Sequence, residues 1–187
     1  MAQFIQHCLE LRYIRGPCFL TNQTLPVSPI SFQMLAFTAT ALLAFSQRNL
    51  VRTQQLLDEL AGLGVSLPEA SELRARIALE QGNAQFALRF LDSQIRLHGD
   101  HPGLRETYAS ALFVTNRWDE AQAQLAVARQ LGAPVWRIAY GEGLIEESKG
   151  NFASAKSWYE QALQQRPKWT PAESRLRALV ASGRTSQ

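Results

Sequence analysis

Small and apolar residues recur along this chain at a fixed interval of 34 positions. The clearest series is Thr53, Ala87, Ala121 and Ala155. A second series lies four residues later, at Leu57, Leu91, Leu125 and Tyr159. A third lies twelve residues before the first, at Ala41, Ala75, Ala109 and Gly143. A repeat of this length is typical of arrays of helix-turn-helix units, so the pattern predicts an all-α protein of about four such units.

The spacing also predicts where each helix begins and ends. Positions four and seven residues apart lie on one helical face and are expected to be buried together. Gly or Asn follows the first helix of a unit, at Gly82-Asn83, Asn116 and Gly150-Asn151, where a turn needs left-handed backbone geometry. The predicted helix pairs are 33–47 with 50–63, 68–81 with 84–98, 102–115 with 118–131, and 135–149 with 152–165.

A last helix is predicted from about residue 171 to residue 182. Its residues Leu176, Leu179 and Val180 are expected to face the array, and Arg175 is expected to face water. Trp136 and Trp169 follow predicted unit boundaries. We expect these two indole rings to lie between neighbouring units.

This spacing resembles the tetratricopeptide repeat (TPR) family, most clearly in the last unit, through Gly143, Gly150, Ala155, Tyr159, Ala162 and Pro167. The resemblance implies a right-handed TPR-type solenoid with repeats at 34–67, 68–101, 102–135 and 136–167. Residues 1–33 would precede it as a cap or loose tail, and residues 168–187 would follow as a capping helix and tail. Glu142 and Glu146 depart from the pattern, because the family prefers Leu and an aromatic residue there.

Composition narrows the class of protein. The 187 residues are 46% hydrophobic and 19% charged, which is typical of one folded domain. The net charge is +3, with no run of like charges that would indicate a nucleic-acid-binding tail. Cys8 and Cys18 are interpreted as two unpaired thiols, although they could form a disulfide in an exported chain.

Residues 16–47 contain no charged side chain. The continuous apolar part, residues 34–45, is shorter than the roughly 20 residues that span a bilayer. We interpret it as the first helix of the first repeat, which favours a cytoplasmic protein. The alternative is an exported or periplasmic protein in which residues 34–45 act as a signal or anchor.

The resemblance implies that the first helix of each unit lines a concave groove. The residues carried over to that groove are Leu35, Leu42, Phe45, Glu69, Glu72, Arg76, Glu106, Phe113, Tyr140, Leu144 and Glu147. They predict a groove that is apolar at one end and acidic in the middle. Such a groove suits a peptide or helix that carries apolar and basic residues. Alternatively, the carboxylates are an ordinary solvated face and residues 1–33 cover the apolar end.

The favoured function is a non-catalytic scaffold or adaptor that holds a partner protein, for example in the assembly of a larger complex. The loosely conforming repeats resemble those of bacterial proteins of secretion, pilus assembly or envelope biogenesis. The competing hypothesis is a structural protein that forms a homodimer through its first repeat. The sequence has no phosphate loop, nucleophile elbow or zinc spacing, so we expect no enzyme activity, cofactor or metal.

One function found in the TPR family is disfavoured. Members that hold the acidic C-termini of cytosolic chaperones use a clamp of Lys, Asn and Arg. The matching positions here are Thr38, Leu42, Leu73, Gly103 and Thr107. None of these side chains is charged, so the clamp is not expected.

Overall fold

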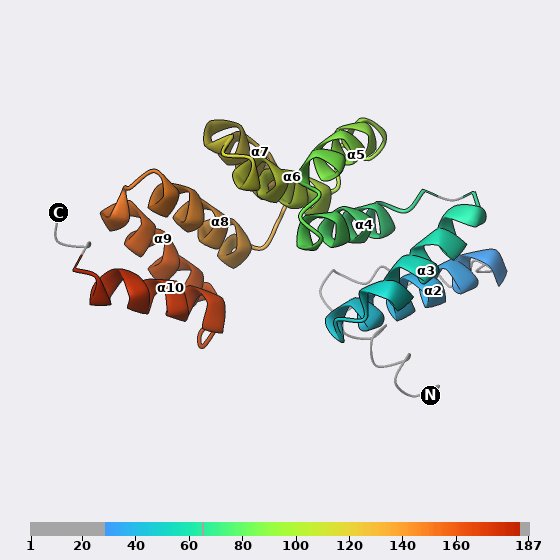
Figure 1. The fold of residues 1–187 in the computed structure, drawn as a ribbon, viewed down its shortest axis with the longest axis horizontal. Coiled ribbons are helices and arrows are strands. Elements are labelled where there is room, and N and C mark those ends of the chain that lie inside the picture. The colour runs from blue at the N-terminus through green and yellow to red at the C-terminus, as the bar shows by residue number, and fades with distance from the viewer. Residues whose placement is uncertain (1–28, 65, 184–187) are drawn as a thin grey trace, which may run out of the picture. The chain divides into compact units, whose positions relative to one another are not determined.

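A computed structural model describes residues 29–64 and 66–183, with the side chains of 29–33 and 35 left out. Within these residues the chain forms nine α-helices and no strand (Figure 1). The helices are α2 (Pro29–Ser46), α3 (Leu50–Gly62), α4 (Pro68–Glu80), α5 (Ala84–Leu97), α6 (Pro102–Val114), α7 (Trp118–Gln130), α8 (Val135–Ser148), α9 (Phe152–Gln165) and α10 (Thr170–Ala181). The predicted all-α fold is confirmed. Cys8, Cys18 and most of the segment 1–33 lie outside the described residues.

The helices pack as the 34-residue period predicts. Helices α4, α6 and α8 each contact the helix that follows, and each pair contacts the next through α5 with α6 and α7 with α8. The first helices of successive pairs also touch, α4 with α6 and α6 with α8. From α3 to α10 each helix begins and ends within one residue of its predicted bounds. Helix α2 is the exception, because it begins at Pro29.

The turns within the second, third and fourth helix pairs use the residues that the sequence singles out, whereas the first pair turns at Arg48, with a φ of 59°. Gly82 and Gly150 have φ values of 78° and 85°, and Asn116 has a φ of 60°. Asn83 then begins α5 as its N-cap, because its side chain accepts a hydrogen bond from the backbone N–H of Phe86 at 3.2 Å. These local conformations fix where one helix stops and the next starts.

The periodic residues form the core. The fully buried members of the first and third series are Ala41, Ala75, Thr53, Ala87, Ala121 and Ala155. Thr53 keeps its hydroxyl satisfied by donating to the Asn49 carbonyl at 2.8 Å. Small side chains at these positions let the paired helices approach, and the larger residues of the second series fill the space beside them.

The two glutamates that depart from the TPR pattern form polar contacts. The side-chain amide of Gln122, on α7, donates to Glu142 and to Glu146 at 3.1 Å each. The Lys149 ammonium donates to the Gln122 oxygen at 2.8 Å and to Asp119 at 2.7 Å. Helix α8 therefore packs on α7 through a hydrogen-bonded network at the place where the family has apolar contacts.

Residues 34–45, whose apolar run raised the question of a signal or anchor, lie within α2. Ala41 and Ala44 pack with Leu56 and Leu60 of α3 in one apolar cluster. In the described part of the chain, none of the helices combines the length and the apolar character needed to cross a membrane.

Candidate functional site

The predicted groove residues of α4, α6 and α8 lie on helices that contact one another in sequence. We call the surface that these residues form the first-helix face. It has two distinct parts. Charged side chains of all three helices meet at its centre, and apolar side chains of α6 and α8 meet beside α9 and α10.

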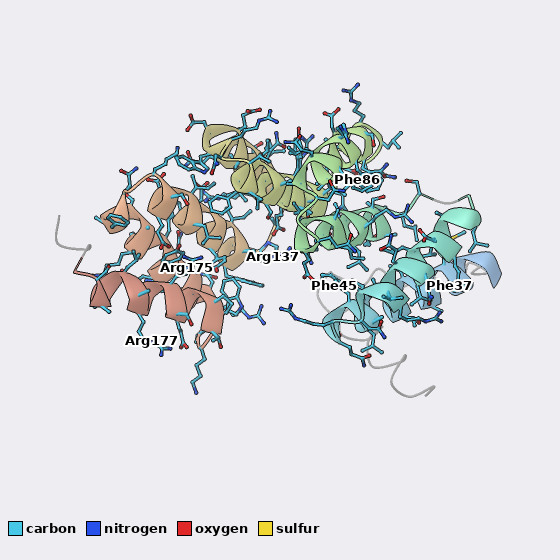
Figure 2. The ribbon with its side chains drawn as sticks, in the orientation of Figure 1. Phe37, Phe45, Phe86, Arg137, Arg175 and Arg177 are labelled. Atoms are coloured by element: carbon cyan, nitrogen blue, oxygen red, sulfur yellow. The ribbon has the colours of Figure 1, made fainter. Side chains whose placement is uncertain are left out.

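At the centre, two glutamates and two arginines form a Glu–Arg network of Glu72, Arg76, Glu106 and Arg137. Arg137, labelled in Figure 2, forms an ion pair with Glu106, with Nε 2.6 Å from a carboxylate oxygen, and its Nη2 lies 4.0 Å from Oε1 of Glu72. Arg76 lies 2.8 Å from the same oxygen of Glu72, one helical turn away on α4. The network links three helices, and its formal charge is zero.

The carboxylates of this network are poorly exposed. The Glu106 side chain is only 10% exposed. Burial raises the pKa of Glu106 above its ordinary value and Glu72 adds to the rise, whereas Arg137 and Arg76 oppose it. Glu69, in contrast, keeps 38% of its side chain exposed, 3.8 Å from His101. At the centre of the face, Glu72 and Glu106 are therefore paired within the chain, and Glu69 is more accessible than either.

The second part of the face is a pocket of about 250 Å³, which we call the C-terminal pocket. Its lining residues are Phe113, Leu144, Glu147, Ser148, Phe152 and Arg175. Three of these, Phe113, Leu144 and Glu147, are predicted groove residues that the fold brings together from α6 and α8. Phe152 begins α9 and Arg175 lies on α10, so two further helices complete the pocket.

Glu147 is held in place from two sides. It accepts a hydrogen bond from the Tyr159 hydroxyl at 2.6 Å and another from Arg175 at 3.3 Å. Tyr159 is fully buried. Burial, together with the bond to Glu147, raises the pKa of Tyr159, so its hydroxyl stays protonated and keeps donating. The Glu147 carboxylate is thus held in place at the pocket by the chain's own side chains.

Tyr140, another predicted groove residue, belongs to an aromatic cluster. Its ring lies 5.7 Å from that of Tyr159 and 4.7 Å from that of Trp169. Trp136 and Trp169 meet edge to face at 4.6 Å, and Arg166 lies 4.3 Å over the Trp136 ring. The two tryptophans thus connect α8 to the start of α10. The ring of Tyr140 is partly buried and packs between helices.

The predicted apolar end of the groove is divided between core and surface. Phe45 packs against the cluster shared by α2 and α3, whereas Leu42 is 46% exposed. The side chain of Leu35 lies outside the described residues. On α10, Leu179 is buried as predicted, but Val180 is 55% exposed, so the prediction that it faces the array is wrong.

Solved structures place this arrangement in a known fold. TTC0263, a thermophilic TPR protein of Thermus thermophilus, matches with a TM-score of 0.72 and 17% identity, over 81% of this chain and 84% of that one. This chain has the tetratricopeptide-repeat fold. PilF of Pseudomonas aeruginosa matches with a TM-score of 0.68 and 17% identity, over 81% and 69% of the two chains.

A third TPR structure is the first TPR of Spaghetti (RPAP3) bound to the HSP90 peptide SRMEEVD. It matches with a TM-score of 0.55 and 19% identity, over 62% of this chain and 91% of that one. No family model matches the sequence, and no curated protein matches it. The TPR resemblance of the sequence is confirmed at the level of the fold.

Of the positions that match the chaperone clamp of some TPR proteins, several are buried and Leu42 is exposed. Leu73 and Thr107 are buried, and Thr107 donates its hydroxyl to the Gly103 carbonyl at 2.9 Å. Thr38 donates to the Met34 carbonyl within its own helix. None of these positions presents a charge to a ligand.

The sequence predicts that Arg175 faces water, and its side chain is half-exposed, but the sequence does not indicate its contact with Glu147 at 3.3 Å. In Figure 2, Arg175 lies on the side of α10 toward α8 and α9, and Arg177 lies on the other side. Helix α10 follows the last predicted repeat, so the 34-residue register assigns its residues no position. Among the described residues, no group of three or more His, Cys, Asp or Glu side chains could hold a metal ion.

Proposed function

We propose that this TPR protein is a non-catalytic interaction scaffold that binds a segment of a partner polypeptide on its first-helix face. The observation that carries the proposal is the C-terminal pocket, where Phe113 and Leu144 from neighbouring first helices meet beside Glu147 and Arg175. Apolar contacts with a few fixed polar groups are typical of binding sites in proteins. The TPR domain of RPAP3, with a peptide bound, is a precedent for a peptide ligand on this fold.

The partner's chemistry follows from the charges that remain accessible. We propose apolar anchors as the main source of affinity, because Glu72 and Glu106 are already paired with arginines. A basic residue of the partner would meet Glu69, whose side chain is the more exposed. The acidic SRMEEVD peptide of the RPAP3 complex is a poor model for this partner, since the clamp positions of this chain are uncharged.

The wider architecture is part of the same proposal. It comprises four repeats at 34–67, 68–101, 102–135 and 136–167, preceded by residues 1–33 and closed by the capping helix and tail of 168–187. We assign the scaffold to the cytoplasm and to the assembly of a larger complex. The packing of Ala41 and Ala44 against α3 supports a place for residues 34–45 in the first repeat.

Selection from a display library of random short peptides tests the proposal. The full chain is compared with Ser110→Trp, which adds bulk at an exposed site of the first-helix face, and with Ser93→Trp on α5. Both serines are exposed, and each donates to a carbonyl of its own helix. We expect enriched peptides to bind at least about tenfold more weakly to Ser110→Trp and unchanged to Ser93→Trp. Failure to enrich any peptide, or native affinity in Ser110→Trp, would overturn the proposal.

Self-association is the second candidate, favoured by exposed apolar side chains at the N-terminal end of the array. Leu43 is 52% exposed on α2, and Val51 is 72% exposed on α3. Paired chains would cover these groups. Light scattering across a range of protein concentrations distinguishes the two candidates. A dimer formed through these side chains should dissociate into monomers on dilution and in Leu43→Lys. A monomer mass at every concentration would exclude self-association.

A further inference from the structure

The size of the C-terminal pocket limits what can fill it. Its volume is about 250 Å³. Pockets that enclose drug-sized ligands measure roughly 300–1,000 Å³, so this one is small for a ligand of that size or for a larger cofactor. A cavity of roughly 150 Å³ holds benzene, so there is room for one large apolar side chain.

The walls favour the same occupant. Phe113 and Leu144 supply apolar surface from α6 and α8, and Phe152 supplies more from α9. Ser148, at the rim, is exposed, and its hydroxyl donates to the Leu144 carbonyl at 2.9 Å. The pocket therefore reaches the surface, and its lining is divided between three apolar side chains and three polar or charged ones.

The polar side of the pocket is a fixed pair of opposite charges. Glu147 accepts one hydrogen bond on each of its oxygens, and a carboxylate has about four acceptor positions, so both oxygens keep capacity. The Arg175 side chain is half-exposed, and a guanidinium carries five N–H donors. An acceptor and a donor thus lie side by side on a pair with no net charge.

A neutral pair of this kind discriminates between ligand groups. A terminal carboxylate would compete with Glu147 for Arg175 and would lie beside a like charge. A lysine or arginine would compete with Arg175 for Glu147. A peptide amide offers one N–H donor and one C=O acceptor, which complements the pair without repulsion.

We propose that the C-terminal pocket takes one aromatic or branched aliphatic side chain from the interior of a partner polypeptide, and that Glu147 and Arg175 bond the backbone amide beside it. This inference rests on the proposed function and specifies its site. It assigns binding roles to Phe152 and Arg175, which lie outside the predicted groove set.

The test uses the peptides selected on the full chain, each synthesised with capped and with free ends. Anisotropy titrations compare the native chain with Ser148→Trp, which covers the pocket rim, and with the matched control Ser93→Trp. We expect one apolar peptide position whose replacement by Ala weakens binding about tenfold. The unmodified peptide should bind about tenfold more weakly to Ser148→Trp than to the native chain. Replacing its apolar residue by Ala should weaken binding to Ser148→Trp little further.

The variant Glu147→Gln tests whether the negative charge of Glu147 favours or opposes binding of the peptide. The amide oxygen of Gln still accepts from Tyr159, but the charge is removed. We expect binding to weaken about threefold and to be the same for capped and free peptide ends. Tighter binding to Glu147→Gln, together with a need for a free C-terminus, would show that the pocket takes a terminal carboxylate and would overturn the inference.

The outcomes separate the two proposals. If Ser110→Trp loses binding and Ser148→Trp keeps it, the first-helix face binds peptide and the pocket inference is wrong. If both variants keep native affinity, both proposals are wrong. Circular dichroism of each variant confirms that the fold is retained, since both serines are exposed and neither substitution removes core packing.

Discussion

Gly143 on α8 lies against the ring of Tyr159 on α9, and the structure leaves no space for a side chain between them. A Cβ atom on Gly143 would lie 2.5 Å from Cε1 and 2.7 Å from Cδ1 of Tyr159. The ring is fully buried, and its hydroxyl is bonded to Glu147, so it cannot easily move aside. We therefore predict that Gly143→Ala destabilises the protein, although Ala normally favours a helix more than Gly does.

The expected size follows from two opposing terms. An extra methyl group in a packed core costs about 1–3 kcal/mol, and Ala in place of a helical Gly returns about 0.5–1 kcal/mol. We expect a net loss of about 1–2 kcal/mol, which lowers the melting temperature by about 2–8 °C in a chain of this size. Gly62→Ala is the matched control, because its added Cβ meets nothing within 4 Å, and it should be neutral or stabilising.

The sequence suggests a compensating change. In the three preceding helix pairs, Ala and Leu occupy the positions that Gly143 and Tyr159 occupy here. In a Tyr159→Leu background we therefore expect Gly143→Ala to be neutral or stabilising, a coupling of about 2 kcal/mol in a double-mutant cycle. Tyr159→Phe keeps the ring and should keep the full cost of Gly143→Ala.

Urea unfolding followed by circular dichroism measures all four corners of the cycle. The reasoning fails if Gly143→Ala stabilises the chain as much as Gly62→Ala does. It also fails if the cost of Gly143→Ala is the same with Leu at position 159 as with Tyr, because the ring would then not be its cause.

Ala121→Leu should cost about 1–3 kcal/mol by overpacking a site that is fully buried, and an unchanged melting temperature would contradict the assigned register. Arg137→Met should cost about 1–3 kcal/mol near pH 7 by removing the ion pair of the largely buried Glu106 carboxylate. Arg137 lowers the Glu106 pKa against the dominant effect of burial, so its loss raises that pKa further. A raised folded-state pKa means that stability is present at low pH and is lost as the pH rises through it. Relative to the native chain, Arg137→Met should therefore lose less free energy of unfolding near pH 4 than near pH 7. Equal losses at the two pH values, measured by urea unfolding, would refute this reasoning.

The helices and the core could be predicted because both repeat with the sequence. The series through Ala87 and Ala121 marks the close contact within each pair, and that contact depends only on residues about one helix apart. Turn residues such as Gly82 and Asn116 act through local backbone geometry. Core and turn residues of this kind recur in successive units, so the 34-residue period indicates them more than once.

The chemistry of the face could be predicted only in part. The sequence places Glu106 on the predicted groove, but it does not show that Arg137, 31 positions later, turns its guanidinium onto it. That pairing depends on the distance between α6 and α8 and on side-chain conformation. Phe152 was missed because the groove was assigned only to the first helix of each unit, whereas α9 is a second helix. Arg175 was missed because α10 follows the last predicted repeat.

The ion pairs within the chain limit the ligand selectivity that the first-helix face can have. Free carboxylates at its centre would attract basic segments over a long range and without regard to shape. Glu72 and Glu106 instead satisfy arginines of the chain itself, and Glu147 is tied to Tyr159 and Arg175. Under the proposed function, discrimination depends on the side chain that fits the C-terminal pocket and on the amide that matches the Glu147–Arg175 pair. These are short-range requirements, because they act only between groups in direct contact.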